Sequence, residues 1–248
     1  MLCALIRMYN FTIKYLNLKK AYFNWSTGKD SALAFYKILQ NKDYNIGSLL
    51  TTVNKKFQRV SMHGVPISLL DQQAKELGLP LYKIEFPEEV SMEKYNEIMK
   101  VGIDKLVQEG YNYSVFGDIF LEDLKKFRDD KLAEQNLEGV YPLWKIDTSE
   151  IIKEFLSLGF KAITVSVNAN LLDKSFVGRV IDKQFIKDLP EGVDVCGENG
   201  EFHTFVFDGP IFKKPINFEV GDKVLKTYPA EESDTWDNSF WYCDLLPK

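Results

Sequence analysis

The chain has 248 residues, 45% of them hydrophobic, which is enough for one large or two modest domains with a buried core. Its 31 basic and 36 acidic residues give a net charge of −5, which argues against a broad basic surface for RNA or DNA. Three separated cysteines without a Cys-x-x-Cys pair favour a reducing, cytoplasmic location and argue against a structural zinc site, and no apolar stretch approaches the roughly 20 residues of a membrane span.

The first twenty residues precede the first clear structural pattern. They contain a short apolar stretch, but they lack the leading basic region and the long apolar core of a secretory signal. We therefore expect residues 1–20 to be an N-terminal extension or the result of a start codon assigned too early.

Residues 26–31 read Ser-Thr-Gly-Lys-Asp-Ser, between an apolar run at 21–25 and a segment with helical periodicity. This order predicts a strand, a tight turn and a helix whose unpaired N–H groups face an anion, with Lys29 as a mobile positive charge for phosphate. The spacing fits neither the Walker loop, because Asp30 follows Lys29, nor the three-glycine dinucleotide fingerprint. The alternative is a helix start capped by Ser26 or Thr27.

Strand and helix patterns alternate up to about residue 168. Strands are predicted at 46–53, 81–86, 113–116 and 162–167, and helices at 32–39, 66–77, 95–106, 121–135 and 149–157. Pro66 suits a first helical turn and Gly78 a C-terminal cap. The alternation predicts an α/β fold with a Rossmann-like parallel sheet, helices on both faces, and ligands at the carboxyl ends of the strands. Residues 26–31, which we call the phosphate loop, and Gly117-Asp118 both fall at such ends.

Helical stripes become fewer after about residue 168, which predicts a smaller C-terminal α+β domain packed against the first. Within it, residues 197–201 hold two glycines and two acids in five positions. Glu198 and Glu201 are suited to hold magnesium, orient an ammonia nucleophile or bind a cationic group. The alternative is an acidic, solvated hairpin turn before an alternating strand at 203–207.

The loop at 26–31 resembles the Ser-Gly-Gly-x-Asp-Ser loop of the ATP pyrophosphatases, with Thr27 in place of the first glycine. Threonine would be strained there if the position needs a positive φ. Further motifs follow in the order found in the diphthine–ammonia ligase family, which the chain resembles from about residue 21 to about residue 216. They are Gly117-Asp118, Arg128, Tyr141-Pro142-Leu143-Trp144, Gly178-Arg179, Cys-Gly-Glu-x-Gly-Glu-x-x-Thr at 196–204 and Asp-Gly-Pro-x-Phe-Lys-Lys-Pro-Ile at 208–216.

The resemblance implies a nucleotide α-hydrolase fold with an ATP-binding domain at 21–140 and a substrate-recognition domain at 141–248. It also implies that ATP, with Mg²⁺, adenylates a carboxylate and that ammonia then displaces AMP to leave an amide. The acceptor would be diphthine on elongation factor 2 in a eukaryote or archaeon, and another metabolite or protein in a bacterium. A tRNA-modifying pyrophosphatase and a non-catalytic nucleotide sensor remain alternatives. No membrane partner is expected, and a homodimer stays open.

The roles of single residues also follow from the resemblance. Lys29 would neutralise the departing pyrophosphate, while Asp30 and Asp118 would bind Mg²⁺ and contribute to catalysis. Glu198, Glu201 and Thr204 would receive the ammonia and the surroundings of the acceptor carboxylate. The residues expected to contact the nucleotide are Ser26, Thr27, Gly28, Lys29, Asp30, Ser31, Val53 and Gly117.

Arginine is rare in this chain, with four residues against 27 lysines. Because Arg128 and Arg179 lie inside the motifs, we expect each to bind phosphate or carboxylate through its guanidinium fork. The alternative is an ion pair with a helix acid such as Asp129 or Asp182. His63 lies where adenine could stack, although a single histidine carries little weight.

Overall fold

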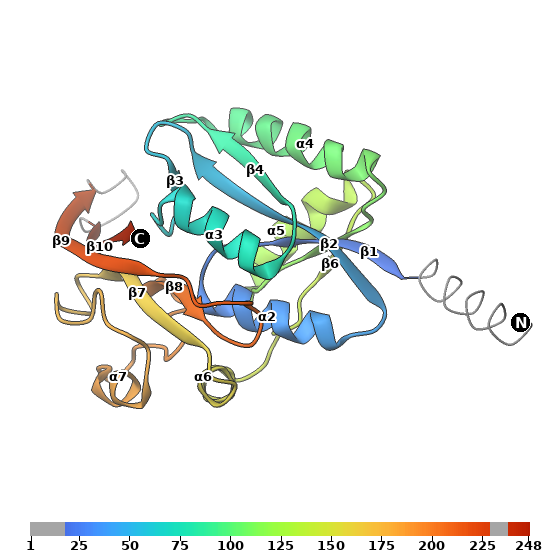
Figure 1. Cartoon of the computed structure of the whole chain (residues 1–248). Coiled ribbons are helices and arrows are strands. Elements are labelled where there is room, and N and C mark those ends of the chain that lie inside the picture. Colours follow the sequence, from blue (N-terminus) through green and yellow to red (C-terminus); the bar gives the residue numbers. More distant parts are fainter. Residues whose placement is uncertain (1–17, 229–237) are drawn as a thin grey trace, which may run out of the picture.

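The computed structural model describes residues 18–228 and 238–248 (Figure 1). The expectation for residues 1–20 falls almost entirely outside this range. Lys19 and Lys20, however, already belong to the first strand, which therefore begins earlier than the apolar run at 21–25 predicts.

The first sheet has the strand order β3-β2-β1-β5-β6, with β4 paired to β2. All of its pairings are parallel except the short one between β2 and β3. Its strands are β1 (Lys19–Asn24), β2 (Tyr44–Asn54), β3 (Arg59–Val60), β4 (Leu81–Phe86), β5 (Tyr113–Val115) and β6 (Glu138–Val140). The predicted parallel sheet is confirmed, and β3 and β6 are short strands that the sequence patterns did not predict.

Helices cover both faces of this sheet (Figure 1). The helices α2 (Lys29–Gln40) and α3 (Ile67–Leu77) lie on one face, and α4 (Met92–Gln108) and α5 (Glu122–Ala133) lie on the other. Strand β1 serves both, because Ala21 and Phe23 pack in one hydrophobic cluster and Tyr22 packs in the other. This arrangement confirms the Rossmann-like fold. None of the helices in the described part of the chain combines the length and apolar character needed to cross a membrane.

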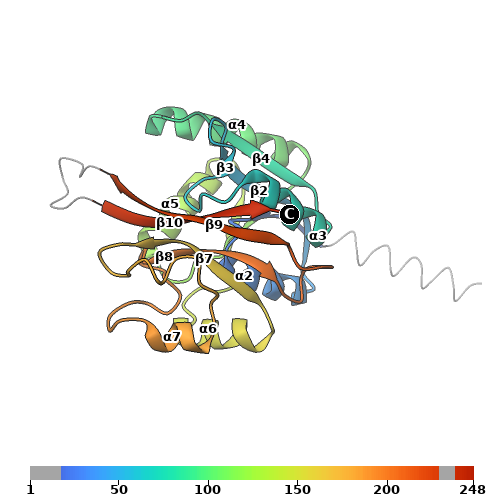
Figure 2. The same cartoon turned by 60° about the vertical axis from the view of Figure 1, so that its left-hand side comes forward.

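A second sheet of four strands follows, with the order β8-β7-β10-β9 and antiparallel pairing throughout. It consists of β7 (Lys161–Asn168), β8 (Phe202–Asp208), β9 (Phe218–Tyr228) and β10 (Asn238–Pro247), and it is accompanied by α6 (Thr148–Ser157) and α7 (Lys183–Asp188). Figure 2 shows the long β9–β10 pair running beside β7 and β8. The sequence predicted β7, β8 and α6, but it did not predict α7, β9 or β10.

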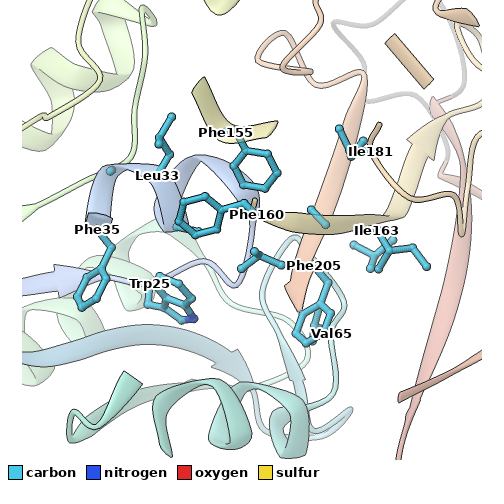
Figure 3. Packing of buried hydrophobic residues seen from close by; sticks show 14 of the residues in the cluster. Trp25, Leu33, Phe35, Val65, Phe155, Phe160, Ile163, Ile181 and Phe205 are labelled. Carbon is cyan, nitrogen blue, oxygen red and sulfur yellow. The ribbon is translucent and has the colours of Figure 1, made fainter. Parts of the chain in front are cut away.

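One hydrophobic cluster runs through both sheets (Figure 3). Trp25 and Phe35 meet edge to face with ring centres 5.9 Å apart, and Phe155 stacks on Phe160 at 5.0 Å. Phe205 of β8 is buried in the same cluster as Trp25. The shared core brings β8 against the carboxyl end of β1, where the phosphate loop begins.

Candidate active site

A cavity of about 900 Å³ lies at the carboxyl ends of β1, β2 and β5 and extends between α4 and α5. Residues from both sheets line it, so segments far apart in the sequence meet there. The predicted site residues that line the cavity are Ser26, Lys29, Asp30, Ser31, Gly117, Asp118, Arg128, Glu198 and Thr204. Those that do not are Thr27, Gly28, Val53, Arg179 and Glu201.

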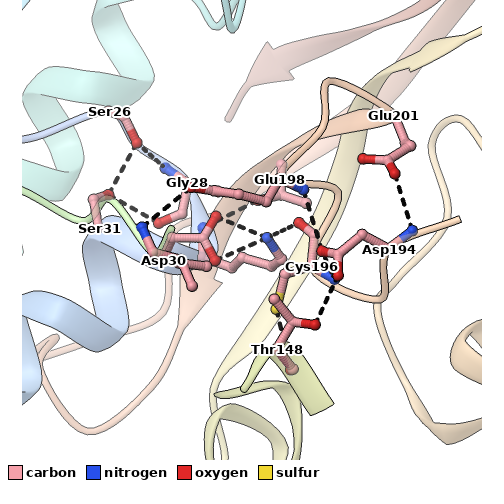
Figure 4. Close-up of polar contacts among 12 residues, drawn as sticks. Ser26, Gly28, Asp30, Ser31, Thr148, Asp194, Cys196, Glu198 and Glu201 are labelled. Carbon is pink, nitrogen blue, oxygen red and sulfur yellow. Dashed lines mark hydrogen bonds and ion pairs between the residues drawn. The ribbon is translucent and has the colours of Figure 1, made fainter. Parts of the chain in front are cut away.

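The phosphate loop is held by short hydrogen bonds of its own (Figure 4). The Ser26 hydroxyl accepts the Gly28 N–H at 3.3 Å and donates to the Ser31 hydroxyl at 3.1 Å, and Ser31 donates to the Gly28 carbonyl at 2.9 Å. The N-cap position of α2 is occupied by Gly28, which has no side chain to cap the helix. The alternative of a helix capped by Ser26 or Thr27 is therefore not realised.

Thr204, on β8, supplies the capping hydroxyl that the N-cap residue Gly28 lacks. Its Oγ1 accepts the N–H of Lys29 at 3.0 Å, so a strand of the second sheet caps the first turn of α2. Thr204 also lines the cavity. The sequence assigned Thr204 to the acceptor, whereas its position beside Lys29 gives it a role in building the nucleotide loop.

Thr27 has a φ of 75°, in the left-handed region that glycine favours. The strain foreseen for threonine at a positive φ is therefore present. For a β-branched residue such a conformation is a true outlier. Thr27 is also fully buried.

Lys29 is buried and connects the phosphate loop to the segment around Cys196 that precedes β8. Its Nζ lies 2.7 and 2.9 Å from the two carboxylate oxygens of Asp30 and also donates to the Cys196 carbonyl. Burial lowers the pKa of Lys29, but the charge of Asp30 and its neighbours more than offsets this, so the pKa lies above its ordinary value. The side chain therefore stays charged where phosphate is expected.

Asp118 and Arg128 meet on the β5 side of the cavity. The Nε of Arg128 is 3.1 Å from Oδ2 of Asp118, and the guanidinium lies 4.5 Å above the Phe116 ring. Burial raises the pKa of Asp118, Arg128 lowers it, and Asp30 raises it further. Arg128 thus has an acid partner, but this partner is Asp118 rather than the helix acid Asp129, which accepts a hydrogen bond from Tyr141.

Glu198 reaches into the cavity from the loop before β8. Its Oε1 accepts the N–H of Ile119 at 3.1 Å. Burial and then the charge of Asp30 raise the pKa of Glu198 to about 7. A carboxyl group with this pKa exchanges protons near neutral pH, as a general acid or base must.

The loop 194–201 is built around a buried carboxylate, that of Glu201 (Figure 4). Glu201 accepts hydrogen bonds from the backbone N–H groups of Asp194 and Asn199, both at 2.9 Å, and from the Asn199 amide at 3.2 Å. Gly197 and Gly200, with φ of 72° and 85°, permit the turn. The segment is therefore a compact loop rather than a solvated hairpin, and Glu201 shapes the loop that carries Glu198.

Replacing Glu201 with glutamine is expected to destabilise the protein by about 1–3 kcal/mol, because an amide nitrogen would then face backbone N–H donors. Urea unfolding of the wild-type and Glu201→Gln proteins measures this loss. An unchanged unfolding free energy together with lost amide formation would instead support the direct catalytic role that the sequence suggested.

Arg179 and Val53 lie away from the cavity. Arg179 pairs with Asp188 and lies 5.7 and 5.4 Å from the ring centres of Phe176 and Phe185. The ion-pair alternative is thus realised, with Asp188 in place of Asp182. Val53 is fully buried within β2. Neither residue lines the cavity.

The sequence did not predict the pairing of His63 with His203 or the contact that Gln73 makes with the phosphate loop. His63 and His203 pack with ring centres 4.7 Å apart on the cavity wall, and burial lowers their pKa values to about 3 and about 4, so both are neutral at pH 7. No local pattern links two histidines so distant in the chain. Gln73 of α3 contacts the loop, and its signal is a polar residue within the apolar stripe of Leu70, Ala74 and Leu77.

Comparison with known proteins covers both halves of this site. Residues 19–137 match the family model described as diphthamide synthase N-terminal domain, and residues 147–245 match the one described as diphthamide synthase C-terminal domain. The chain is 26% identical over 193 residues to diphthine–ammonia ligase of Homo sapiens, and the match covers 70% of this chain and 69% of the human protein. The protein of the same name from Bos taurus is 28% identical with the same coverage. The one from Danio rerio is 28% identical over 176 residues, 65% of this chain and 69% of that protein.

Proposed function

Because the chain belongs to the diphthamide synthase family, we propose that it is an ATP-dependent ligase that forms an amide from a carboxylate and ammonia. One observation carries this proposal: the phosphate loop and the 194–201 loop meet in one cavity, joined by Lys29 and the Cys196 carbonyl. The first loop suits a triphosphate, and the second presents a carboxyl group poised to exchange a proton. Adenylation of the carboxylate and transfer of the acyl group to ammonia would thus take place in the same cavity.

In the proposed first step, an oxygen of the acceptor carboxylate attacks the α-phosphorus of ATP, and the bond to the bridging oxygen of the β-phosphate breaks. Backbone N–H groups at the start of α2 hold the departing pyrophosphate. Lys29 lies beside them, and a phosphate oxygen competes with Asp30 for its ammonium group. Its charge stabilises the negative charge that grows on the leaving group.

In the proposed second step, ammonia attacks the acyl carbon of the adenylate, the carbon–oxygen bond to AMP breaks, and the nitrogen loses a proton. Glu198 is suited to accept that proton, since its pKa of about 7 matches a base that works near neutral pH. Arg128, fixed over Phe116, is suited to orient the acceptor carboxylate.

Asp30 and Asp118 are the residues proposed to hold Mg²⁺, which would supply positive charge to the phosphates. The fit rests on the position of Asp118 in the cavity together with Asp30 and on the buried Oδ2 of Asp118, which lies 3.1 Å from Arg128 Nε without forming a hydrogen bond among the described residues. The described residues contain no cluster of three or more metal-binding side chains. Two carboxylates suffice for Mg²⁺ when substrate phosphates and water complete its shell.

Glu198→Gln is expected to reduce amide formation while stabilising the protein above neutral pH. The folded-state pKa of Glu198 is raised from 4.5 to about 7, so folding binds a proton between these values and wild-type stability falls as pH rises through them. Glutamine lacks this penalty, and the gain should be on the order of 2 kcal/mol at pH 8 and close to zero at pH 4. Urea unfolding at both pH values measures it. Equal stability of the two proteins at pH 8 would contradict a raised pKa.

We propose diphthine as the acceptor, because the relatives are named diphthine–ammonia ligase. The family resemblance implies that this diphthine is carried by elongation factor 2. The cytoplasmic location remains a prediction from the cysteine content. The test is incubation with Mg²⁺, ammonium and ATP labelled at the α-phosphate, with and without elongation factor 2 that carries diphthine. AMP that forms only with both ammonium and the factor supports the proposal. If AMP forms only when a cell extract is added in place of the factor, the acceptor is another molecule. If ADP forms, or if no ATP is consumed, the protein is not a ligase of this kind.

A further inference from the structure

Thr27 is the most strained point of the phosphate loop. It combines a φ of 75° with a β-branched side chain, and its buried hydroxyl has no hydrogen-bond partner among the described residues. Such a backbone persists only where the surrounding structure holds it in place. The contacts of Thr27 therefore decide whether the loop keeps its shape.

Two hydrogen bonds hold the Thr27 carbonyl. One comes from the backbone N–H of Val206 in β8 at 2.9 Å, and the other comes from the side-chain amide of Gln73 in α3 at 3.2 Å. Each donor belongs to an element outside the loop. The carbonyl orientation, and with it the direction of the next peptide N–H groups, is thus fixed from two sides.

Gln73 is fully buried, and its amide is used at both ends. Its nitrogen also donates to the Val206 carbonyl at 2.6 Å, while its oxygen accepts the Trp25 indole N–H at 2.8 Å. Because an indole nitrogen only donates, this contact fixes which end of the amide is oxygen. One side chain therefore ties together the end of β1, the strained residue of the loop and strand β8.

We propose that Gln73 is a positioning residue for ATP: it holds strained Thr27 in the conformation that presents the N–H groups of the loop to phosphate. This rests on the proposed function only in that the loop binds ATP. Without Gln73, the strain at Thr27 shifts the loop toward conformations that do not bind. The apparent affinity then falls by the fraction of molecules that remain competent.

The experiment is a double-mutant cycle with Gln73→Met and Thr27→Gly. Calorimetry measures the Kd for the non-cleavable analogue α,β-methylene-ATP with Mg²⁺ on the full chain. We expect Gln73→Met to weaken binding about tenfold or more in the wild-type background. Glycine removes the strain, so the same change on top of Thr27→Gly should weaken binding by no more than about threefold.

Thr164→Val is the matched control, because Thr164 is also fully buried and donates a 2.6 Å hydrogen bond to a backbone carbonyl, that of Phe176, in the second sheet. It should lower the melting temperature and leave the Kd unchanged. If Gln73→Met does not fold, Gln73→Leu replaces it with the same expectation, since it also removes both amide contacts and buries no charge.

Equal fold-changes from the Gln73 substitution in both backgrounds would overturn this inference and leave the proposed function intact. An effect on Kd no larger than that of Thr164→Val would do the same. Wild-type protein that binds no ATP analogue would overturn the proposed function and this inference with it.

Discussion

Replacing Lys29 with methionine is expected to reduce AMP formation about 100- to 1,000-fold, the usual effect of removing one group that stabilises transition-state charge. Methionine keeps most of the side-chain volume but removes the ammonium that contacts Asp30 and Cys196. The carboxylates of Asp30 and Glu198 then face the phosphates without the positive charge of Lys29. The measurement is release of labelled AMP at saturating ATP.

Lys37→Met is the matched control for this substitution. Lys37 lies in the last turn of the same helix and pairs with Glu154 at 2.7 Å, away from the cavity. It loses a lysine–carboxylate contact just as Lys29→Met does, but its AMP formation should stay within about twofold of wild type, because a half-exposed ion pair contributes little. Similar losses in both variants would mean that α2 has been disturbed and that Lys29 has no special role.

Replacing Gly117 with alanine is expected to weaken ATP binding about 100-fold. A Cβ at this position would lie 2.9 Å from the Ser31 N atom, which is closer than real Cβ contacts, and 3.1 Å from the carbonyl carbon of Asp30, which is tighter than most. Both neighbours are backbone atoms, so the first turn of α2 must move rather than a side chain. A displacement of the loop N–H groups by a fraction of an ångström weakens every phosphate contact at once. Calorimetry with the non-cleavable ATP analogue measures the change.

Gly221→Ala serves as the comparison for Gly117→Ala. Gly221 lies in β9, far from the cavity, and its added Cβ would meet Asp244 at 3.3 Å. It tests the effect of one extra methyl group in a packed position, and ATP affinity should not change. If Gly117→Ala binds ATP as tightly as Gly221→Ala, the approach of Gly117 to α2 is not what sets the loop.

Much of the first sheet could be predicted because its elements carry their own periodic signal. The strand 81–86 is found exactly where the apolar pattern puts it, and Gly78 ends α3 with a φ of 73° as a glycine cap predicts. The strand β9 escaped because none of its residues is buried, so period-two burial leaves little trace in its sequence.

The site shows a similar division. Residues next to one another in the chain, such as those of the phosphate loop, could be assigned together because their spacing carries the chemistry. The roles of Thr204 and Glu201 could not, because they depend on which backbone N–H groups the fold places beside them. Arg179 stood inside a motif, yet its partner is the nearby Asp188, and sequence position alone could not separate a local ion pair from a ligand contact.

Because Thr204 of β8 caps α2, the phosphate loop depends on both halves of the chain. A fragment that ends after β6 would keep the loop sequence but lose the Thr204 hydroxyl and the Val206 N–H. Such a fragment could not be joined to a different C-terminal domain without losing these two contacts. A substitution in β8 that displaces Thr204 or Val206 is therefore expected to change the phosphate loop as well. If binding of ATP changes the affinity for an acceptor that contacts β8, binding of the acceptor changes the affinity for ATP by the same factor.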